Sequence, residues 1–229
     1  MKRRAFVLGA GGLLAANHAP RLFGQTKESE LDAMPQCADV ANKLVEYEPV
    51  LMVIRKEDRE IAKRILSSKI DIVESPVNDG WSRDSGPMVL VNKNGGRRVA
   101  GFTFNGWGAK FPPYADDAQL KARLAKHFEM PMVPIDLVLE GGAVAVDGDG
   151  TCLTTEQCSL NVNRNKKANR EVIEKKLNDS LGTKKVIWLG KGLEPDPVTD
   201  GHIDGIAAFS RLNRFLSGCQ LNKLDPLVD

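Results

Sequence analysis

The stretch that decides the fold reads DDAQLKARLAKHFEMPMVPIDLVLEGG and covers residues 116–142. Its first half predicts an amphipathic helix over 116–128, because apolar residues recur there every four positions on one face. The apolar segment 132–135 predicts a short strand, and 139–142 predicts a loop that carries the acidic side chain of Glu140. A helix, a strand and an acidic loop therefore follow one another in this part of the chain.

The same pattern occurs on both sides of this stretch. Helices are predicted over 57–67 and about 168–181, and each precedes a short apolar strand, at 70–73 and 185–188. A further helix and strand are predicted upstream, at 38–47 and 50–54, and turn residues at 94–96 and 146–151 predict β-hairpins. The helices start roughly 55 residues apart, and one supersecondary unit per period favours a radial α/β array.

Composition and charge exclude several classes of protein. The 229 residues are 42% hydrophobic and 27% charged, which is typical of a globular chain and excludes disorder and a coiled coil. A net charge of +2 gives no electrostatic argument for a nucleic-acid partner, and no apolar run is long enough to span a membrane. The four cysteines show no C-x-x-C spacing and are too few for a disulfide scaffold. They are Cys37, Cys152, Cys158 and Cys219.

Residues 1–25 predict a cleaved export signal, and with it a periplasmic or secreted protein. The basic residues 2–4 precede an apolar, glycine-containing segment at 5–16, and the paired arginines are typical of a twin-arginine signal. The alternative is a first strand followed by a glycine-rich phosphate loop at 9–12.

Acidic residues concentrate in the three loops that follow the predicted strands, at 78–87, 139–142 and 196–204. In a radial array these loops converge, which would bring Asp84, Glu140, His202 and Asp204 to one small volume. We expect His202 and Asp204 to share one face of a strand, because they are two residues apart. Carboxylates that are crowded together repel one another unless a cation lies among them, so the pattern predicts a metal ion or a guanidinium group.

A guanidinium fits these loops better than a metal. It is planar, permanently charged and offers five N–H donors that carboxylates accept in pairs. The other two histidines, His18 and His127, do not lie in comparable loops, although an oxygen-ligand metal site remains the alternative. Chemistry at the guanidinium carbon requires a nucleophile, expected to be a thiolate, and an acid–base group, for which His202 has a suitable pKa range.

Five stretches in this order resemble the agmatine deiminase and bacterial-type peptidylarginine deiminase family of the guanidino-group-modifying (pentein) superfamily. They are WSRDSGP at 81–87, FNGWG at 104–108, LEGG at 139–142, LTTE to NVNRN at 153–165 and GHID at 201–204. The resemblance implies an α/β fold with five ββαβ modules around a central substrate pocket, of which this chain would form a part. It also implies hydrolysis of a guanidino group to a ureido group, with agmatine or peptidylarginine as substrate.

The resemblance assigns roles to seven residues. It implies that Asp84 and Asp204 grip the guanidinium and that Glu140 and His202 form the catalytic pair. Trp81, Asn105 and Trp107 resemble residues of the pocket wall. No organic cofactor or metal is implied.

The family's nucleophilic cysteine lies in a Gly-Gly-Gly-x-x-His-Cys motif that this sequence does not contain. We therefore expect a partial deiminase domain over 36–209 and an atypical tail over 210–229 without the next strand and hairpin. Cys219 is not assigned as the nucleophile, and no other residue is. The alternative function is a truncated, inactive member of the family that at most binds guanidinium ligands.

Overall fold

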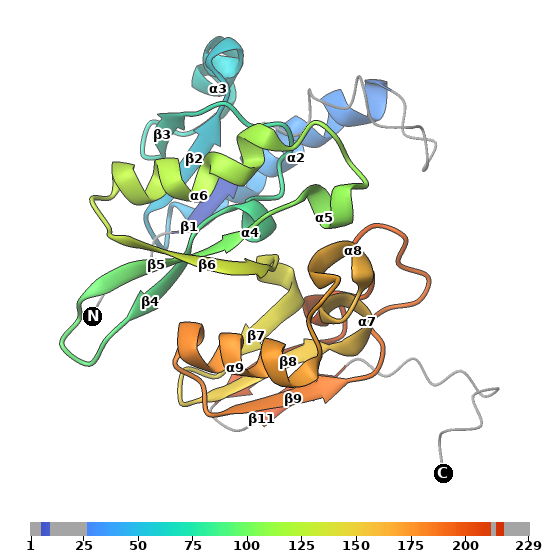
Figure 1. Ribbon diagram of the computed structural model, residues 1–229. Helices are drawn as coiled ribbons and strands as arrows, with labels where there is room; N and C mark the ends of the chain where they lie inside the picture. Colours follow the sequence, from blue (N-terminus) through green and yellow to red (C-terminus); the bar gives the residue numbers. More distant parts are fainter. Residues whose placement is uncertain (1–5, 10–26, 212–213, 218–229) are drawn as a thin grey trace. The chain divides into compact units, whose positions relative to one another are not determined.

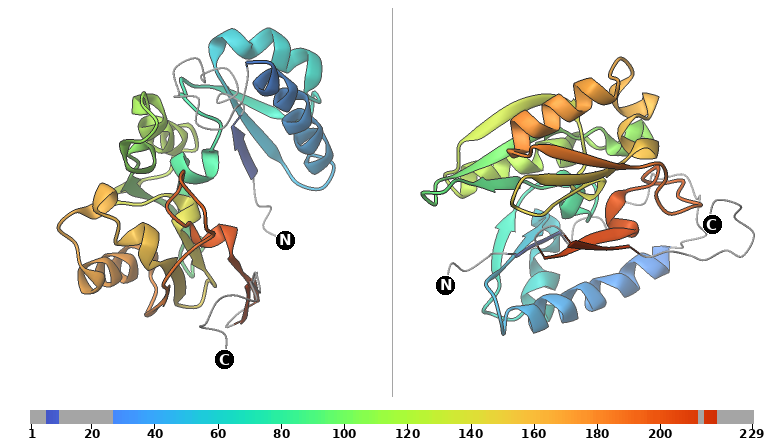
Figure 2. Two further views of the ribbon diagram at one scale, coloured as in Figure 1. Left: turned by 90° about the vertical axis from the view of Figure 1, so that its right-hand side faces the viewer. Right: turned by 90° about the horizontal axis from the view of Figure 1, so that it is seen from below.

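Residues 6–9, 27–211 and 214–217 are described by the structure of the protein, a computed structural model. The chain divides into two units, Met1–Gly141 and Gly142–Asp229, and Figures 1 and 2 show the course of the chain within each.

The first sheet of the first unit is parallel and has the order β1-β2-β3. Its strands are β1 (Phe6–Gly9), β2 (Val50–Ile54) and β3 (Asp71–Glu74). All five residues of β2 are buried, because both faces of this apolar strand are covered. Its even-numbered residues pack against α2 (Lys27–Leu44) and α3 (Arg59–Ile65), and its odd-numbered residues pack against α6 (Ala115–His127). The alternation of side chains along a strand thus joins helices on both faces of the sheet.

The helices around this sheet differ in their bounds from the sequence prediction. The predicted helix 57–67 is a 3-10 turn, η1 (Lys56–Asp58), followed by the shorter α3. The helix α3 ends at Ile65, because the next residue, Leu66, has an extended backbone. The backbone N–H of Ser67 then donates a hydrogen bond of 2.6 Å to the Asn42 side chain. The upstream helix α2 begins well before the predicted start at residue 38 and ends at Leu44.

The second sheet of this unit has the order β4-β5-β6, and α6 lies in the connection between its last two strands. Its strands are β4 (Met88–Val91), β5 (Arg97–Thr103) and β6 (Met132–Val138). The predicted turn at 94–96 joins β4 and β5 into an antiparallel hairpin, and α6 carries the chain to β6, which pairs in parallel with β5. The segment α5 (Gly106–Ala109) lies between β5 and α6, and α4 (Ser82–Ser85) precedes β4 (Figure 1).

The second unit contains the same arrangement of strands and helix. β7 (Val144–Val146) and β8 (Thr151–Thr155) form the hairpin predicted at 146–151, and β9 (Lys185–Leu189) pairs in parallel with β8. The connection between β8 and β9 contains α7 (Glu156–Ser159), α8 (Val162–Asn165) and α9 (Arg170–Leu181). The ββαβ order predicted from the sequence is therefore present in both units.

The prediction for the end of the chain is wrong in one respect. A strand and hairpin follow the last predicted loop, because β10 (Ala207–Arg211) pairs antiparallel with β11 (Arg214–Ser217). The hairpin continues past residue 209, where the sequence predicted the tail to begin. Cys219 lies outside the described residues.

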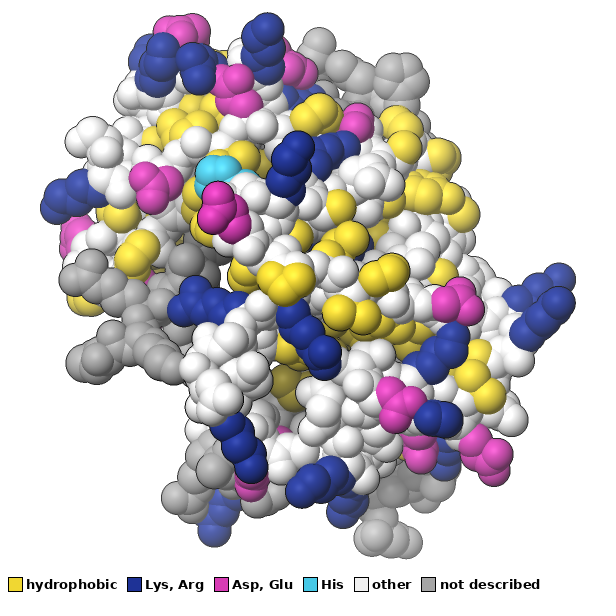
Figure 3. Space-filling view, turned by 60° about the vertical axis from the view of Figure 1, so that its left-hand side comes forward, with side chains coloured by type: hydrophobic (Ala, Val, Ile, Leu, Met, Phe, Trp, Pro, Cys, Tyr) yellow, Lys and Arg dark blue, Asp and Glu magenta, His cyan; other side chains and the backbone are white. Residues whose placement is uncertain are grey.

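The predicted export signal falls mostly outside the described residues, as does His18. Residues 6–9 are described and form β1, which pairs with β2 from Phe6 opposite Val50 and agrees with the alternative of a first strand. The signal stays a prediction. In the part of the chain that the structure describes, every helix is too short or too polar to cross a bilayer. Figure 3 shows described basic and acidic side chains interspersed over the face in view.

Candidate functional site

Asp84 is a buried carboxylate held by an indole N–H. It lies in the short helix α4, and 7% of its surface is exposed. The side chain of Trp107 is also buried, with the residue 3% exposed, and its Nε1–H donates a hydrogen bond of 2.9 Å to Asp84 Oδ2. Two residues that the resemblance implied for the site, 23 positions apart in the sequence, are therefore in direct contact.

Trp107 reaches Asp84 from a turn with left-handed backbone. The four residues of α5 all have positive φ, with values of 65° at Gly106, 54° at Trp107, 82° at Gly108 and 60° at Ala109. Such a run is costly for residues with a Cβ atom, so the surroundings have to hold it in place. The Asn105 side chain accepts a hydrogen bond of 2.8 Å from the Gly108 N–H and thereby caps the turn.

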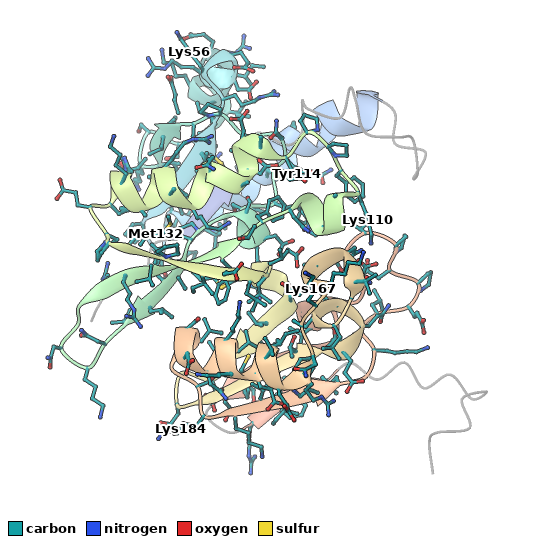
Figure 4. All side chains as sticks on the ribbon, viewed as in Figure 1. Lys56, Lys110, Tyr114, Met132, Lys167 and Lys184 are labelled. Atoms are coloured by element: carbon teal, nitrogen blue, oxygen red, sulfur yellow. The ribbon has the colours of Figure 1, made fainter. Side chains whose placement is uncertain are left out.

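Aromatic side chains fix the orientation of the indole. Phe104 and Phe111 pack edge-on against the Trp107 ring, with ring centres 5.1 Å and 5.7 Å away. Tyr114, labelled at the start of α6 in Figure 4, packs against Gly106, where any Cβ atom would overlap its ring. The orientation of Trp107, a predicted pocket-wall residue, is therefore fixed by the aromatic rings packed against it. Asn105, the other predicted wall residue of this turn, hydrogen-bonds to the backbone of the turn.

Glu140 is the most deeply buried carboxylate of the site, with 0% of its surface exposed. It follows β6, whose end is fixed to β5 by a backbone hydrogen bond of 3.0 Å from Leu139 N to Thr103 O. The next residue, Gly141, packs directly against the backbone carbonyl of Arg83. The loop that carries Glu140 is therefore in contact with the helix that carries Asp84, within the first unit. The sequence predicted that these two acidic loops converge.

This close approach makes Gly141 a sensitive position. In Gly141→Ala the new methyl group would overlap the Arg83 carbonyl oxygen, and backbone atoms cannot rotate away as a flexible side chain can. We expect a loss of about 1–3 kcal/mol in the free energy of unfolding, measured by urea denaturation. The matched control is Gly190→Ala, because no atom lies within 4 Å of a Cβ at Gly190. Equal stability of the two variants would contradict this packing.

Asp117 fixes the loop that leads to Asp84, and the sequence analysis did not identify it. Its Oδ1 atom accepts the backbone N–H groups of Asn78 and Asp79 at 2.8 Å and 3.2 Å. Burial raises the pKa of Asp117, although these two hydrogen bonds act to lower it. The only sequence signal was an acidic pair in the first turn of a helix, which usually interacts with the helix dipole.

His202 lies in the second unit at the end of a tightly bonded loop. It is 5% exposed, caps the 3-10 turn η3 (Ile203–Gly205), and its N–H donates to Thr199 Oγ1 at 3.2 Å. Asp196 accepts the backbone N–H groups of Val198, Thr199 and Gly201 at 3.1 Å, 2.8 Å and 2.9 Å. Partial burial acts to raise the pKa of Asp196, but these bonds and the Thr199 hydroxyl hold it below its usual value. The loop is therefore anchored to an ionised carboxylate.

A buried ion pair holds the same loop from the other side. Arg164, from the NVNRN motif, has a side chain only 1% exposed, and its Nη1 atom lies 2.5 Å from Asp200 Oδ2. Its Nη2 atom donates to the Thr199 carbonyl at 3.1 Å, and Asn163 donates to Asp200 at 3.0 Å. Thr155 adds a hydrogen bond of 2.6 Å to the Gly201 carbonyl. The motif therefore positions the residues just before His202.

Three further observations concern the predicted site. His202 and Asp204 do not share a face of a strand, because residues 203–205 form the 3-10 turn η3, which separates a buried His202 from an exposed Asp204. Trp81 precedes α4 and is 65% exposed, so little of its surface packs against the described residues. The Cys158 sulfur and a ring nitrogen of His202 lie within 4.8 Å of one another, a pairing that the sequence analysis did not foresee.

Two buried thiols occupy the second unit. Cys158 is 1% exposed and Cys152 is 0% exposed, in agreement with their expected role as small packing residues. Burial raises the pKa of Cys152 to about 12, which makes this thiol unreactive at neutral pH.

Comparison with known proteins identifies the family. The family model of Porphyromonas-type peptidyl-arginine deiminases matches residues 19–228. A Shewanella baltica protein named "Putative agmatine deiminase" is 37% identical over 193 residues, which are 82% of this chain and 52% of that protein. The chain thus spans about half the length of the curated relatives it matches.

Solved structures give the same result for the fold. The agmatine deiminase of Enterococcus faecalis matches 96% of this chain and 60% of its own, with 29% identity and a TM-score of 0.87. A C. jejuni agmatine deiminase with substrate bound matches 94% of this chain and 62% of its own, with 28% identity and a TM-score of 0.81. These matches confirm the predicted pentein-type α/β fold. With the family model covering residues 19–228, they show that this chain belongs to the Porphyromonas-type peptidyl-arginine deiminase family.

Proposed function

We propose that the chain acts in the hydrolytic deimination of a guanidino group, which converts a guanidinium compound and water into a ureido compound and ammonia. The buried carboxylates of the first unit carry this proposal, because Asp84 and Glu140 lie on two segments that pack against each other. Paired carboxylates match the planar N–H donors of a guanidinium, and its permanent charge offsets their mutual repulsion.

The site residues take different roles in this reaction. Asp84 binds the guanidinium with one oxygen while its other oxygen stays fixed by Trp107. Glu140 supplies the second negative charge. His202 takes a proton from the attacking water as general base, so that the water oxygen bonds to the guanidinium carbon, and then returns a proton to the nitrogen that leaves as ammonia. Asp204 is the proposed second gripping carboxylate and Trp81 a wall of the pocket.

The proposed substrate is a small guanidino compound, and agmatine is the first choice. The curated relative and both solved structures compared above are named for agmatine, and one of them holds its substrate. The products are N-carbamoylputrescine and ammonia. Peptidylarginine, which gives the family its name, is the second substrate to test.

The test is incubation of the chain with agmatine, with ammonia and the ureido product measured separately. We expect both products at equal amounts above a blank without protein. Calorimetry with agmatine is run on the same sample. Heat of binding without either product would overturn the proposed hydrolysis and support the inactive, guanidinium-binding alternative. The absence of both heat and product in a folded sample would overturn both.

A further inference from the structure

Lys121 is a buried ammonium group in the first unit that the proposed reaction does not use. It lies on α6, one turn after Asp117, and is 5% exposed. Among the described residues its Nζ atom has no hydrogen-bond partner. The Nζ atom lies 5.8 Å from the centre of the Phe104 ring, a cation–π contact that compensates only part of the lost hydration. A buried ammonium group without a hydrogen-bond acceptor destabilises the fold unless negative charges lie near it.

Those negative charges belong to the candidate site. The charged groups that act on Lys121 are Glu140, at the end of β6, and Asp117, on its own helix. Burial lowers the pKa of Lys121 to about 8, although both carboxylates act to raise it. Lys121 is also linked to Asp84 through packed side chains, because Phe104 packs on Trp107 and Trp107 donates to Asp84. A change of charge beside Glu140 or Asp84 therefore acts on this ammonium group.

We propose that Lys121 is a positioning residue whose ammonium balances the charge of Glu140 in the ligand-free protein, and that binding of a guanidinium compound drives off its proton. The proposal rests on the proposed function, since it requires the guanidinium to bind beside Glu140. The bond that breaks is Lys121 Nζ–H, the proton passes to buffer, and the neutral amine remains. The permanent charge of the guanidinium then replaces that of the ammonium.

The direction of the effect follows from Coulomb repulsion in a poorly solvated site. A second cation near Glu140 disfavours the charged form of Lys121, so its pKa in the complex lies below the value of about 8 in the free protein. Between these two pKa values, binding releases protons and becomes tighter as pH rises, by up to about tenfold per pH unit. Well above pH 8 the amine is neutral before the ligand binds, and the affinity levels off.

The test is calorimetric titration of the whole chain with agmatine at pH 7.5 in PIPES and in Tris, two buffers with very different heats of ionisation. We expect different heats in the two buffers, equivalent to the release of about half to three quarters of a proton per agmatine bound. In Lys121→Gln, which is always neutral, and Lys121→Arg, which is always charged, the buffer dependence should vanish. The exposed Lys126 on the same helix supplies the matched control, and Lys126→Gln should behave as wild type.

The outcomes separate this inference from the proposed function. Equal heats in both buffers for a wild-type chain that binds agmatine would overturn the role of Lys121 and leave the function standing. Proton release that persists in Lys121→Gln would also overturn it. The absence of binding in wild type would overturn the proposed function and this inference together. If both Lys121 variants fail to fold, the wild-type chain still overturns the inference when the heats in the two buffers are equal or the affinity does not rise between pH 6.5 and 8.

Discussion

Asp84→Asn is expected to weaken agmatine binding by about 30-fold or more, equivalent to about 2 kcal/mol, while the chain stays folded. The amide keeps an oxygen that can accept the Trp107 Nε1–H bond, so the local packing survives. The negative charge that a guanidinium requires is lost, however, and charge-assisted hydrogen bonds are about twice as strong as neutral ones. The effect should therefore appear in binding and not in folding.

Titration calorimetry with agmatine measures this effect, and thermal unfolding in parallel reports on the fold. The matched control is Asp71→Asn, which removes an exposed carboxylate from β3 in the same unit. Wild-type affinity in Asp84→Asn would show that this carboxylate does not bind the guanidinium. A similar loss in Asp71→Asn would show that net charge alone is responsible.

Arg164→Met is expected to have the largest effect on stability, about 3 kcal/mol in the free energy of unfolding. Methionine fills much of the same space, but Asp200 loses its ion pair and Thr199 loses a donor to its carbonyl. Breaking one partner of a buried pair leaves the other charge without compensation, which costs more than the pair itself contributes. The melting temperature should fall by about 6–12 °C for a chain of this length.

Urea denaturation of the variant and of Lys175→Met checks this expectation. Lys175 forms an exposed ion pair with Asp179 on α9, at 2.6 Å, and such pairs contribute only about 0.3–0.5 kcal/mol. A loss below about 1 kcal/mol in Arg164→Met would mean that the loop before His202 is held by Asp196 and Thr155 without the arginine.

The elements that the sequence predicted are those with a local signal. The helix at 116–128, the strands at 50–54 and 185–188 and both hairpins match the structure to within a few residues, because apolar spacing and turn residues determine them. The last residue of that helix pattern, Phe128, nevertheless lies beyond α6 and is 38% exposed. Periodicity indicates which face is apolar, but not where the neighbouring strands stop covering it.

The candidate site was predictable only in part. The resemblance singled out Asp84, Trp107 and Glu140, and the structure brings their segments together in the first unit. Lys121 gave no signal, because a lysine on an amphipathic helix is usually solvated and its contacts come from distant residues such as Phe104 and Glu140. The convergence of the loops around Asp84 and Asp204, which belong to different units, stays a prediction.

The left-handed turn that contains Trp107 limits which amino acids can occupy its positions. Two of its four positions, Gly106 and Gly108, adopt positive φ without strain because glycine has no Cβ atom. At Trp107 and Ala109 the same backbone conformation is strained by the Cβ atom. If positions 105–109 are randomised and folded variants are selected, we expect mainly glycine and asparagine at every position except 107. Protein engineers who wish to change the surroundings of Asp84 therefore have more freedom in the side chains around this turn than in the turn itself.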